Sequence, residues 1–162
     1  MKVTIFGGTG VTGLLVIKNA LSAGHSVTVF ARTPSKIAIQ HSNLSIIAGG
    51  LTDLDKIETA VKDADAVISI LGPTGKSKGL VISNGIKNII AAMEKHGVKR
   101  LIATATPSYK DSNDKFQFGF TFGVLLVKAL LKDTYQNILE ICEQIAKSQL
   151  EWTIVRLPML SN

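Results

Sequence analysis

The stretch Gly7-Gly8-Thr9-Gly10-Val11-Thr12-Gly13 decides the fold of this 162-residue chain. It directly follows the apolar and β-branched run Lys2–Phe6, which is typical of a buried strand. It leads into Val11–Ala23, where apolar side chains recur with helical spacing and Gly24 provides a natural C-terminal stop. The stretch therefore predicts a strand, a tight glycine turn and a helix that begins at the turn.

The rest of the chain repeats this alternation. Five further short apolar runs are expected to be strands: Ser26–Phe30, Leu44–Ala48, Ala66–Leu71, Lys99–Thr104 and Trp152–Arg156. Three further helices are expected: Thr52–Lys62, with a capping-box pattern at Thr52-Asp53-Leu54-Asp55, then Gly79–His96 and Asp133–Lys147. We interpret the apolar stripes of these helices as packing faces. The pattern predicts an α/β fold, a Rossmann-type doubly wound parallel sheet with strand order 3-2-1-4-5-6 and helices on both faces.

The composition fits a single domain that spans residues 1–162. Hydrophobic residues make up 46% and charged residues 19%, which argues against disorder. Cys142 is the only cysteine, so we expect a buried thiol, no intramolecular disulfide and a cytoplasmic protein. Neither the N-terminus nor the apolar stretch from Phe116 to Leu131 has the length and composition of a signal peptide or a membrane span. We therefore expect no membrane segment.

The position of the glycine turn points to a dinucleotide ligand. In the predicted sheet, a crevice opens beyond the carboxyl ends of strands 1 and 4. Gly7, Gly10 and Gly13 would let the backbone approach a pyrophosphate, whose charge the helix N-terminus attracts. The hydroxyls of Thr9 and Thr12 can hydrogen-bond phosphate, although Thr12 could instead face solvent. We expect NADP(H) here; the alternative is a tight turn that binds nothing.

Arg32 stands at the end of the second predicted strand, where an NAD-specific site would place Asp or Glu on the ribose 2′-hydroxyl. A guanidinium can bind a 2′-phosphate with charge-assisted hydrogen bonds worth about 1.5–3 kcal/mol each. NADP(H) is therefore the expected cofactor, with NAD(H) and an unliganded, solvated Arg32 as alternatives. The chain has 18 Lys and Arg against 12 Asp and Glu, which suits a phosphorylated ligand. The basic residues form no Arg-rich helix, so we expect no nucleic-acid partner.

Further motifs carry a resemblance to a known family. They are Ala31-Arg32, Asp65-Ala-Val-Ile-Ser-Ile-Leu-Gly72, Ala91-Ala-Met-Glu-Lys-His-Gly97-Val-Lys-Arg and Val155-Arg-Leu-Pro158, together with the glycine turn. They resemble the atypical short-chain dehydrogenase/reductases, and within these the NmrA-like NAD(P)H-flavin reductase and biliverdin-IXβ reductase group. The resemblance implies NADP(H) as cofactor and hydride transfer to a flavin, a bilin or a quinone. The flavin would be an acceptor substrate and not a tightly bound group.

The resemblance also implies roles for single residues. Gly72 would lie beside the adenosine ribose, Thr106 near the nicotinamide, and Pro158 and Met159 along the nicotinamide carboxamide. Gly49-Gly50 departs from the Gly-Asp pair of the family, which leaves Leu51 as an apolar wall of the adenine pocket. The expected cofactor contacts are Gly7, Thr9, Gly10, Val11, Thr12, Gly13, Arg32, Leu51, Gly72, Thr106, Pro158 and Met159. Thr106 is also the one candidate catalytic residue.

A second departure concerns the mechanism. The Tyr-x-x-x-Lys pair of alcohol-oxidising short-chain dehydrogenases is absent, because Asn113 follows Tyr109 and Leu139 follows Tyr135 at this spacing. This absence disfavours alcohol, ketone and sugar-nucleotide epimerase chemistry. Flavin and bilin reduction needs little acid catalysis from side chains, because the acceptor takes the charge and solvent supplies the proton. We therefore expect an NAD(P)H-dependent reductase.

The resembled family continues for several dozen residues beyond the position of Asn162, on the acceptor side. The alternative function is therefore a non-catalytic NADP(H)-sensing regulatory module of the NmrA-like type. Phe116 and Phe118 begin a run of alternating phenylalanines that continues with Phe120 and Phe122. They could bind the acceptor, form a homo-oligomer interface or lie in the core, three alternatives of equal weight. The histidines His25, His41 and His96 are expected at the surface or at helix caps, without a metal.

Overall fold

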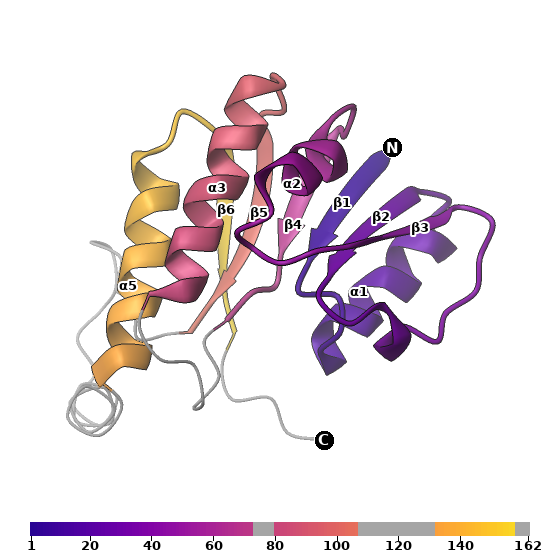
Figure 1. The fold of residues 1–162 in the computed structure, drawn as a ribbon, viewed down its shortest axis with the longest axis horizontal. Helices are drawn as coiled ribbons and strands as arrows, with labels where there is room; N and C mark the ends of the chain where they lie inside the picture. The colour runs from indigo at the N-terminus through magenta and orange to yellow at the C-terminus, as the bar shows by residue number, and fades with distance from the viewer. Residues whose placement is uncertain (73–79, 107–131, 158–162) are drawn as a thin grey trace.

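The computed structural model describes residues 1–72, 80–106 and 132–157 (Figure 1). Several predictions concern residues outside these ranges and lie beyond what the structure describes: Tyr109, Phe116, Phe118, Phe120, Phe122, Pro158 and Met159.

Six strands in the described part of the chain form one parallel sheet in the order β3-β2-β1-β4-β5-β6, as predicted. They are β1 (Lys2–Phe6), β2 (Ser26–Ala31), β3 (Leu44–Ala48), β4 (Ala66–Ser69), β5 (Arg100–Ala105) and β6 (Glu151–Arg156). In the centre of the sheet, Ile5 of β1 lies between Val29 of β2 and Ile68 of β4. Strands β1 and β4 are neighbours in the sheet, and the chain continues from β1 toward one edge of the sheet and from β4 toward the other. The strand order therefore reverses between β1 and β4, which is the position of the ligand crevice in a Rossmann sheet.

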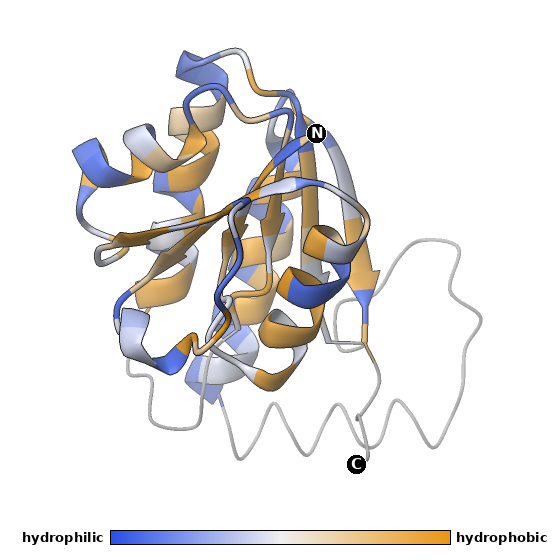
Figure 2. Ribbon diagram, turned by 90° about the vertical axis from the view of Figure 1, so that its right-hand side faces the viewer, coloured by the Kyte–Doolittle hydropathy of each residue, from blue (hydrophilic) through white to orange (hydrophobic). Residues whose placement is uncertain are grey.

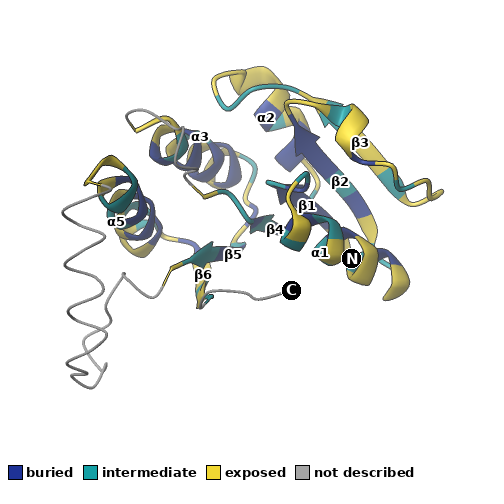
Figure 3. Ribbon diagram, turned by 90° about the horizontal axis from the view of Figure 1, so that it is seen from below, coloured by how far each residue is buried: buried dark blue, intermediate teal, exposed yellow. Residues whose placement is uncertain are grey.

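Helices cover both faces of the sheet. Helix α1 (Val11–Ser22) lies on one face, whereas α2 (Leu54–Val61), α3 (Val81–Lys95) and α5 (Lys132–Lys147) lie on the other (Figure 3). A short 3-10 helix, η1 (Pro34–Lys36), follows β2. No helix within the described ranges is long and apolar enough to cross a membrane.

Each face has its own hydrophobic core, and apolar residues concentrate on the strands and on the helix surfaces that meet them (Figure 2). On the α1 face, Ile17 and Leu21 pack against residues of β1 and β2. On the other face, the core joins Phe6 of β1 to residues of α2, α3 and α5, as far along the chain as Leu150. The central strands are buried, while the edge strands β3 and β6 are largely exposed in the described structure.

Two local predictions were wrong. Strand β4 ends at Ser69, two residues earlier than expected, because the chain turns away from the ladder after the amide of Ile70 has bonded to the carbonyl of Phe6 at 2.8 Å. The capping box at Thr52 does not form. Asp53 is the N-cap of α2 and makes no side-chain cap bond, because its Oδ2 instead accepts a hydrogen bond from the Gly50 amide at 2.7 Å.

Candidate functional site

The glycine turn joins β1 to α1 at the carboxyl edge of the sheet. Gly7 has a φ of 84°, and a Cβ there would lie 2.6 Å from the carbonyl oxygen of Ile70. A Cβ on Gly13 would collide with the carbonyl oxygen of Gly7. Gly10 differs, because among the described residues only the Gly7 oxygen, at 3.9 Å, would lie within 4 Å of its Cβ. The turn itself therefore requires Gly7 and Gly13, whereas Gly10 faces open space.

The N-terminus of α1 lies beside that space. Its first turn contains no acidic residue, and its N-cap, Gly10, makes no side-chain bond. The amide of Leu14 donates to the Gly10 carbonyl at 2.9 Å, so the amides of the three preceding residues lie ahead of the helical ladder. The helix dipole adds a partial positive charge at this end. Such a helix end is suited to hold a phosphate or pyrophosphate group.

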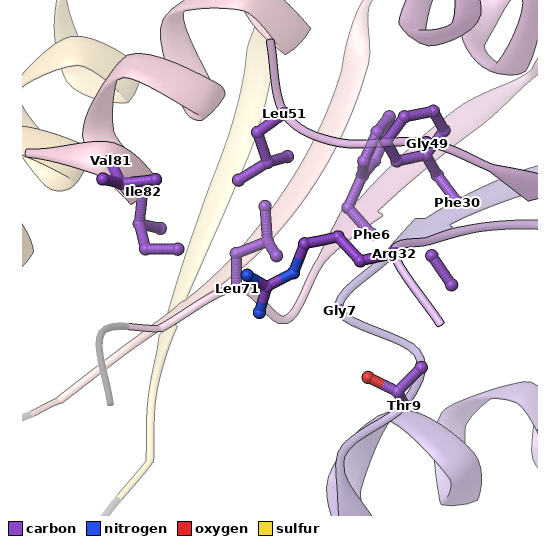
Figure 4. A pocket seen from close by; sticks show the side chains of 11 residues that line it. Phe6, Gly7, Thr9, Phe30, Arg32, Gly49, Leu51, Leu71, Val81 and Ile82 are labelled. Atoms are coloured by element: carbon purple, nitrogen blue, oxygen red, sulfur yellow. The ribbon is translucent and has the colours of Figure 1, made fainter. Parts of the chain in front are cut away.

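A first hollow of about 120 Å³ lies beside the turn, on the side of β2 and β3 (Figure 4). The Arg32 side chain extends into it from the end of β2, in the direction of Leu71 (Figure 4). Three elements that are distant in sequence thus meet here, namely the glycine turn, the end of β2 and the start of α3. The lining residues are Phe6, Gly7, Thr9, Phe30, Ala31, Arg32, Gly49, Leu51, Leu71, Val81 and Ile82.

An aromatic pair forms one side of the first hollow. The rings of Phe6 and Phe30 lie with their centroids 5.2 Å apart and their planes tilted by 41°. Gly49 makes room for this pair, because a Cβ there would lie 2.6 Å from Cζ of Phe30. Position 49 therefore requires glycine for packing, as in the family's Gly-Asp pair, and the departure from that pair lies at Gly50 alone.

Leu51 also lines the first hollow, and α3 holds it in place. A Cβ on Gly85 would lie 2.6 Å from Cδ1 of Leu51, so only glycine lets the leucine approach the helix this closely. Nδ2 of Asn88, one turn further along α3, donates a hydrogen bond of 2.8 Å to the Leu51 carbonyl. Leu51 was predicted from the sequence, whereas Gly85 and Asn88 were not. A glycine inside an otherwise helical pattern was the signal that could have indicated a close contact.

A second hollow of about 340 Å³ lies beyond the ends of β4, β5 and β6 and is bordered on one side by α5. The face that α5 presents to it contains Thr134, Ile138, Ile141 and Cys142, which the helical repeat brings onto one side. The sequence pattern of α5 predicted a packing face and no contact with a ligand. The lining residues are Thr12, Ile70, Leu71, Gly72, Thr104, Ala105, Thr106, Thr134, Ile138, Ile141, Cys142 and Leu157.

The two hollows bring most of the described candidate residues together. Gly7, Thr9, Arg32 and Leu51 line the first, and Thr12, Gly72 and Thr106 line the second. Leu71 borders both, so the hollows adjoin at the end of β4. The side chain of Val11 is 76% exposed and lines neither hollow, so Val11 offers its backbone amide alone.

Residues 7–162 match the family model described as NAD(P)H-binding. The chain belongs to this NAD(P)H-binding family. The match covers the glycine turn and all later described elements, and it agrees with the predicted nucleotide-binding fold.

Among curated relatives of this NAD(P)H-binding chain is 2-alkyl-3-oxoalkanoate reductase of Stenotrophomonas maltophilia, 33% identical over 113 residues. That alignment covers 67% of this chain and 34% of the relative. Another is a 3-beta-hydroxysteroid dehydrogenase of Mycolicibacterium neoaurum, with 29% identity over 66% of this chain and 32% of the relative. The chain therefore spans about a third of the length of the curated relatives that it matches.

Solved structures share the fold. A short-chain dehydrogenase/reductase of Veillonella parvula in complex with NADP superimposes with a TM-score of 0.76 at 21% identity, over 99% of this chain and 70% of that one. ChuY, an anaerobillin reductase of Escherichia coli O157:H7, gives a TM-score of 0.77 at 19% identity, over 96% of this chain and 72% of that one. Both likenesses confirm the Rossmann-type sheet.

Among the described residues, two titratable groups of the NAD(P)H-binding chain have shifted pKa values. Cys142 is 1% exposed, which confirms the prediction of a buried thiol, and this burial raises the pKa of the thiol to about 11. On α2, the hydrogen bond from Lys95 lowers the pKa of Glu58.

His96 is the C-cap of α3, as expected of a cap residue. In the described part of the chain, no cluster of three or more His, Cys, Asp or Glu residues could hold a metal ion.

Proposed function

We propose that this chain is an NAD(P)H-dependent reductase that transfers a hydride from nicotinamide to a planar acceptor of the flavin, bilin or quinone type. The observation that supports this most strongly is the pair of hollows that adjoin at Leu71, beside the uncapped N-terminus of α1. A dinucleotide has two halves joined by a pyrophosphate, and the crevice offers one hollow for each half.

The residues present fit such a cofactor. The amides that begin α1 would hold the pyrophosphate, and Gly10 leaves the space that this approach needs. In the first hollow, Leu51 would contact the adenine ring, and Arg32 would bind a 2′-phosphate, which favours NADP(H) over NAD(H). In the second hollow, Gly72 and Thr106 would border the ribose and nicotinamide side. The roles of Pro158 and Met159 stay predictions.

The bound nicotinamide would supply the hydride, and the chain would contribute orientation and the exclusion of water. On α5, Thr134 and Ile138 face the second hollow four residues apart, which is the spacing of a Tyr-x-x-x-Lys pair. A threonine and an isoleucine offer neither a phenolic acid nor a cation. Proton delivery would therefore fall to solvent, and the Thr106 hydroxyl would serve as a hydrogen-bonding group at the end of β5.

The test is NADPH oxidation with FMN, riboflavin and a quinone offered separately, repeated with NADH. Arg32→Ala should raise the KM for NADPH roughly ten- to hundredfold, which corresponds to the loss of one charge-assisted bond, and should leave the KM for NADH nearly unchanged. The matched control is Lys62→Ala, which removes one exposed positive charge just after α2, next to the amino ends of the strands. Equal effects of the two variants would argue against the 2′-phosphate role.

The same experiment distinguishes the reductase from the alternative function. Tight NADPH binding without turnover on any acceptor, with similar affinity for NADP⁺, would favour a non-catalytic NADP(H)-sensing module. Acceptor-dependent NADPH oxidation would instead support the reductase.

A further inference from the structure

We propose that the α5 face in the second hollow is the acceptor wall, and that it selects acceptors whose reacting ring carries no charge. The inference rests on the proposed reductase function and adds a substrate class to it. The residues that carry it are Thr134, Ile138, Ile141 and Cys142.

The position of this wall follows from the helix and the sheet together. The four residues recur at the helical spacing of one face, and all of them line the second hollow. Ile138, Ile141 and Cys142 are 7%, 4% and 1% exposed, so packing holds them in place and only a small part of each reaches the hollow, while Thr134 is half-buried nearer the start of α5. Across the hollow lie Leu71 and Thr104, at the ends of β4 and β5. A planar ring between these two sides would be in contact with hydrocarbon on its α5 side.

The electrostatics of this wall favour a neutral ring. A charged substituent moved from water against Ile138 and Ile141 loses solvation, and an apolar wall returns no ion pair. The hydroxyls of Thr134 and Thr104 can hydrogen-bond a neutral carbonyl or ring nitrogen, as donor or as acceptor. Burial keeps the Cys142 thiol neutral through the physiological range, so this group adds no charge to the wall.

The nearest charged residues on α5 lie outside the hollow. Lys132 and Asp133 precede Thr134, are exposed and carry opposite charges, so solvent screens them and their effects on the hollow partly cancel. Gln136 is also exposed and does not line the hollow, although it is only two residues from Thr134. This pair of positions gives a matched test: a lysine at 134 would put a cation at the wall, and a lysine at 136 would put the same charge on the outer surface of the same helix.

The experiment uses menadione and its sulfonated naphthoquinone counterpart, which differ by one negative charge on the ring. Their dissociation constants are measured by calorimetry on the full chain saturated with NADP⁺, and their kcat/KM with NADPH is measured in parallel. Wild type should prefer the neutral quinone in binding. Thr134→Lys should shift the ratio of the two dissociation constants roughly tenfold toward the sulfonated quinone, and Gln136→Lys should leave it within about twofold. The two quinones also differ in reduction potential, which affects kcat/KM. Comparing the ratio of their kcat/KM values between variants cancels this difference.

The binding measurements separate this inference from the function on which it rests. Equal shifts in both lysine variants, or no shift in either, would overturn the acceptor wall even if turnover is normal. A shift confined to Thr134→Lys supports the wall. If that shift occurs without any NADPH oxidation, the wall stands as a ligand-binding surface and the reductase proposal fails.

Discussion

Oδ1 of Asn137 accepts a hydrogen bond of 3.2 Å from the backbone amide of Ser83, and both residues are fully buried. Ser83 lies in the first turn of α3, whose N-cap, Leu80, makes no side-chain cap bond. A residue of α5 thus caps α3 from 54 positions away. Ile82 precedes Ser83 and lines the first hollow, while Ile138 follows Asn137 and lines the second. The bond fixes the walls of both hollows relative to one another.

Asn137→Ala should lower the free energy of unfolding by about 1–3 kcal/mol, because it leaves the buried Ser83 amide without this acceptor. Urea denaturation of the variant measures the loss. The control is Gln136→Ala, the exposed neighbour, which should stay within about 0.5 kcal/mol of wild type. Equal losses in the two variants would mean that the cap contributes nothing specific.

The glycine turn should respond differently at two of its positions. Gly13→Ala should destabilise the fold, because its Cβ would collide with the Gly7 carbonyl oxygen whether or not a ligand is bound. Gly10→Ala should keep wild-type stability, because Gly10 has an extended φ of −80° and open space at its Cβ, yet it should lose NADPH affinity. Thermal unfolding and NADPH titration of both variants test this. A destabilised Gly10→Ala would contradict the assignment of its open space to a ligand.

The contrast between these glycines shows which features of the site can be predicted from the sequence alone. Strand, turn and helix follow from neighbouring residues, so the glycine turn, the strand order and the place of Arg32 could be predicted from local patterns. The contacts that hold Leu51 could not be predicted in this way, because Gly85 and Asn88 belong to a helix that meets Leu51 only after folding. Helical periodicity shows which side of a helix is apolar, but not whether a core or a ligand covers it.

Gly85→Ala should weaken NADPH binding from outside the first hollow. Its Cβ would lie 2.6 Å from Cδ1 and 2.8 Å from Cβ of Leu51, so the whole leucine must move toward the hollow. We expect a loss of about 1–3 kcal/mol in stability together with weaker NADPH affinity. Asn84→Ala, at the exposed neighbouring position on α3, is the matched control. Unchanged NADPH affinity in a folded Gly85→Ala variant would show that Leu51 does not set the adenine pocket.

The thiol of Cys142 should resist alkylation in the native protein. Burial raises its pKa to about 11, so at pH 8 the thiolate fraction is roughly one in a thousand. Because the chain has a single cysteine, a thiol reagent reports on this position alone. The rate should rise steeply with pH and should reach that of a free thiol in denaturant. Similar rates in native and denatured protein would contradict the burial of Cys142.

The ion pair between α2 and α3 should make stability depend on pH in the acid range. Lys95 Nζ lies 2.8 and 2.7 Å from the two carboxylate oxygens of Glu58 and holds the pKa of this group below its ordinary value of 4.5. A carboxylate with a lowered folded-state pKa stabilises the fold above the unfolded-state value and loses this effect as the pH falls through the folded-state value.

Glu58→Gln should therefore melt at a lower temperature than wild type at neutral pH, and the difference should shrink as the pH falls below 4.5. Thermal unfolding across this range measures it. Glu143→Gln is the control, because Glu143 pairs with Lys147 on the same exposed helix surface at 3.1 Å and should have a smaller effect. A constant difference at all pH values would show that the charge of Glu58 is not the cause.

The two hydrophobic cores differ in how much of the chain must have been synthesised before each core can form. Every fully buried member of the α1-face core lies between Val3 and Ile37, whereas the core on the opposite face requires residues from Phe6 to Leu150. Short loops close faster than long ones, so we expect the first β-α-β unit to nucleate folding during synthesis. Ile17→Val should then slow refolding, while Ile145→Val, equally buried, should mainly accelerate unfolding. The half of the protein that carries the glycine turn would thus be in place before the half that carries the proposed acceptor wall.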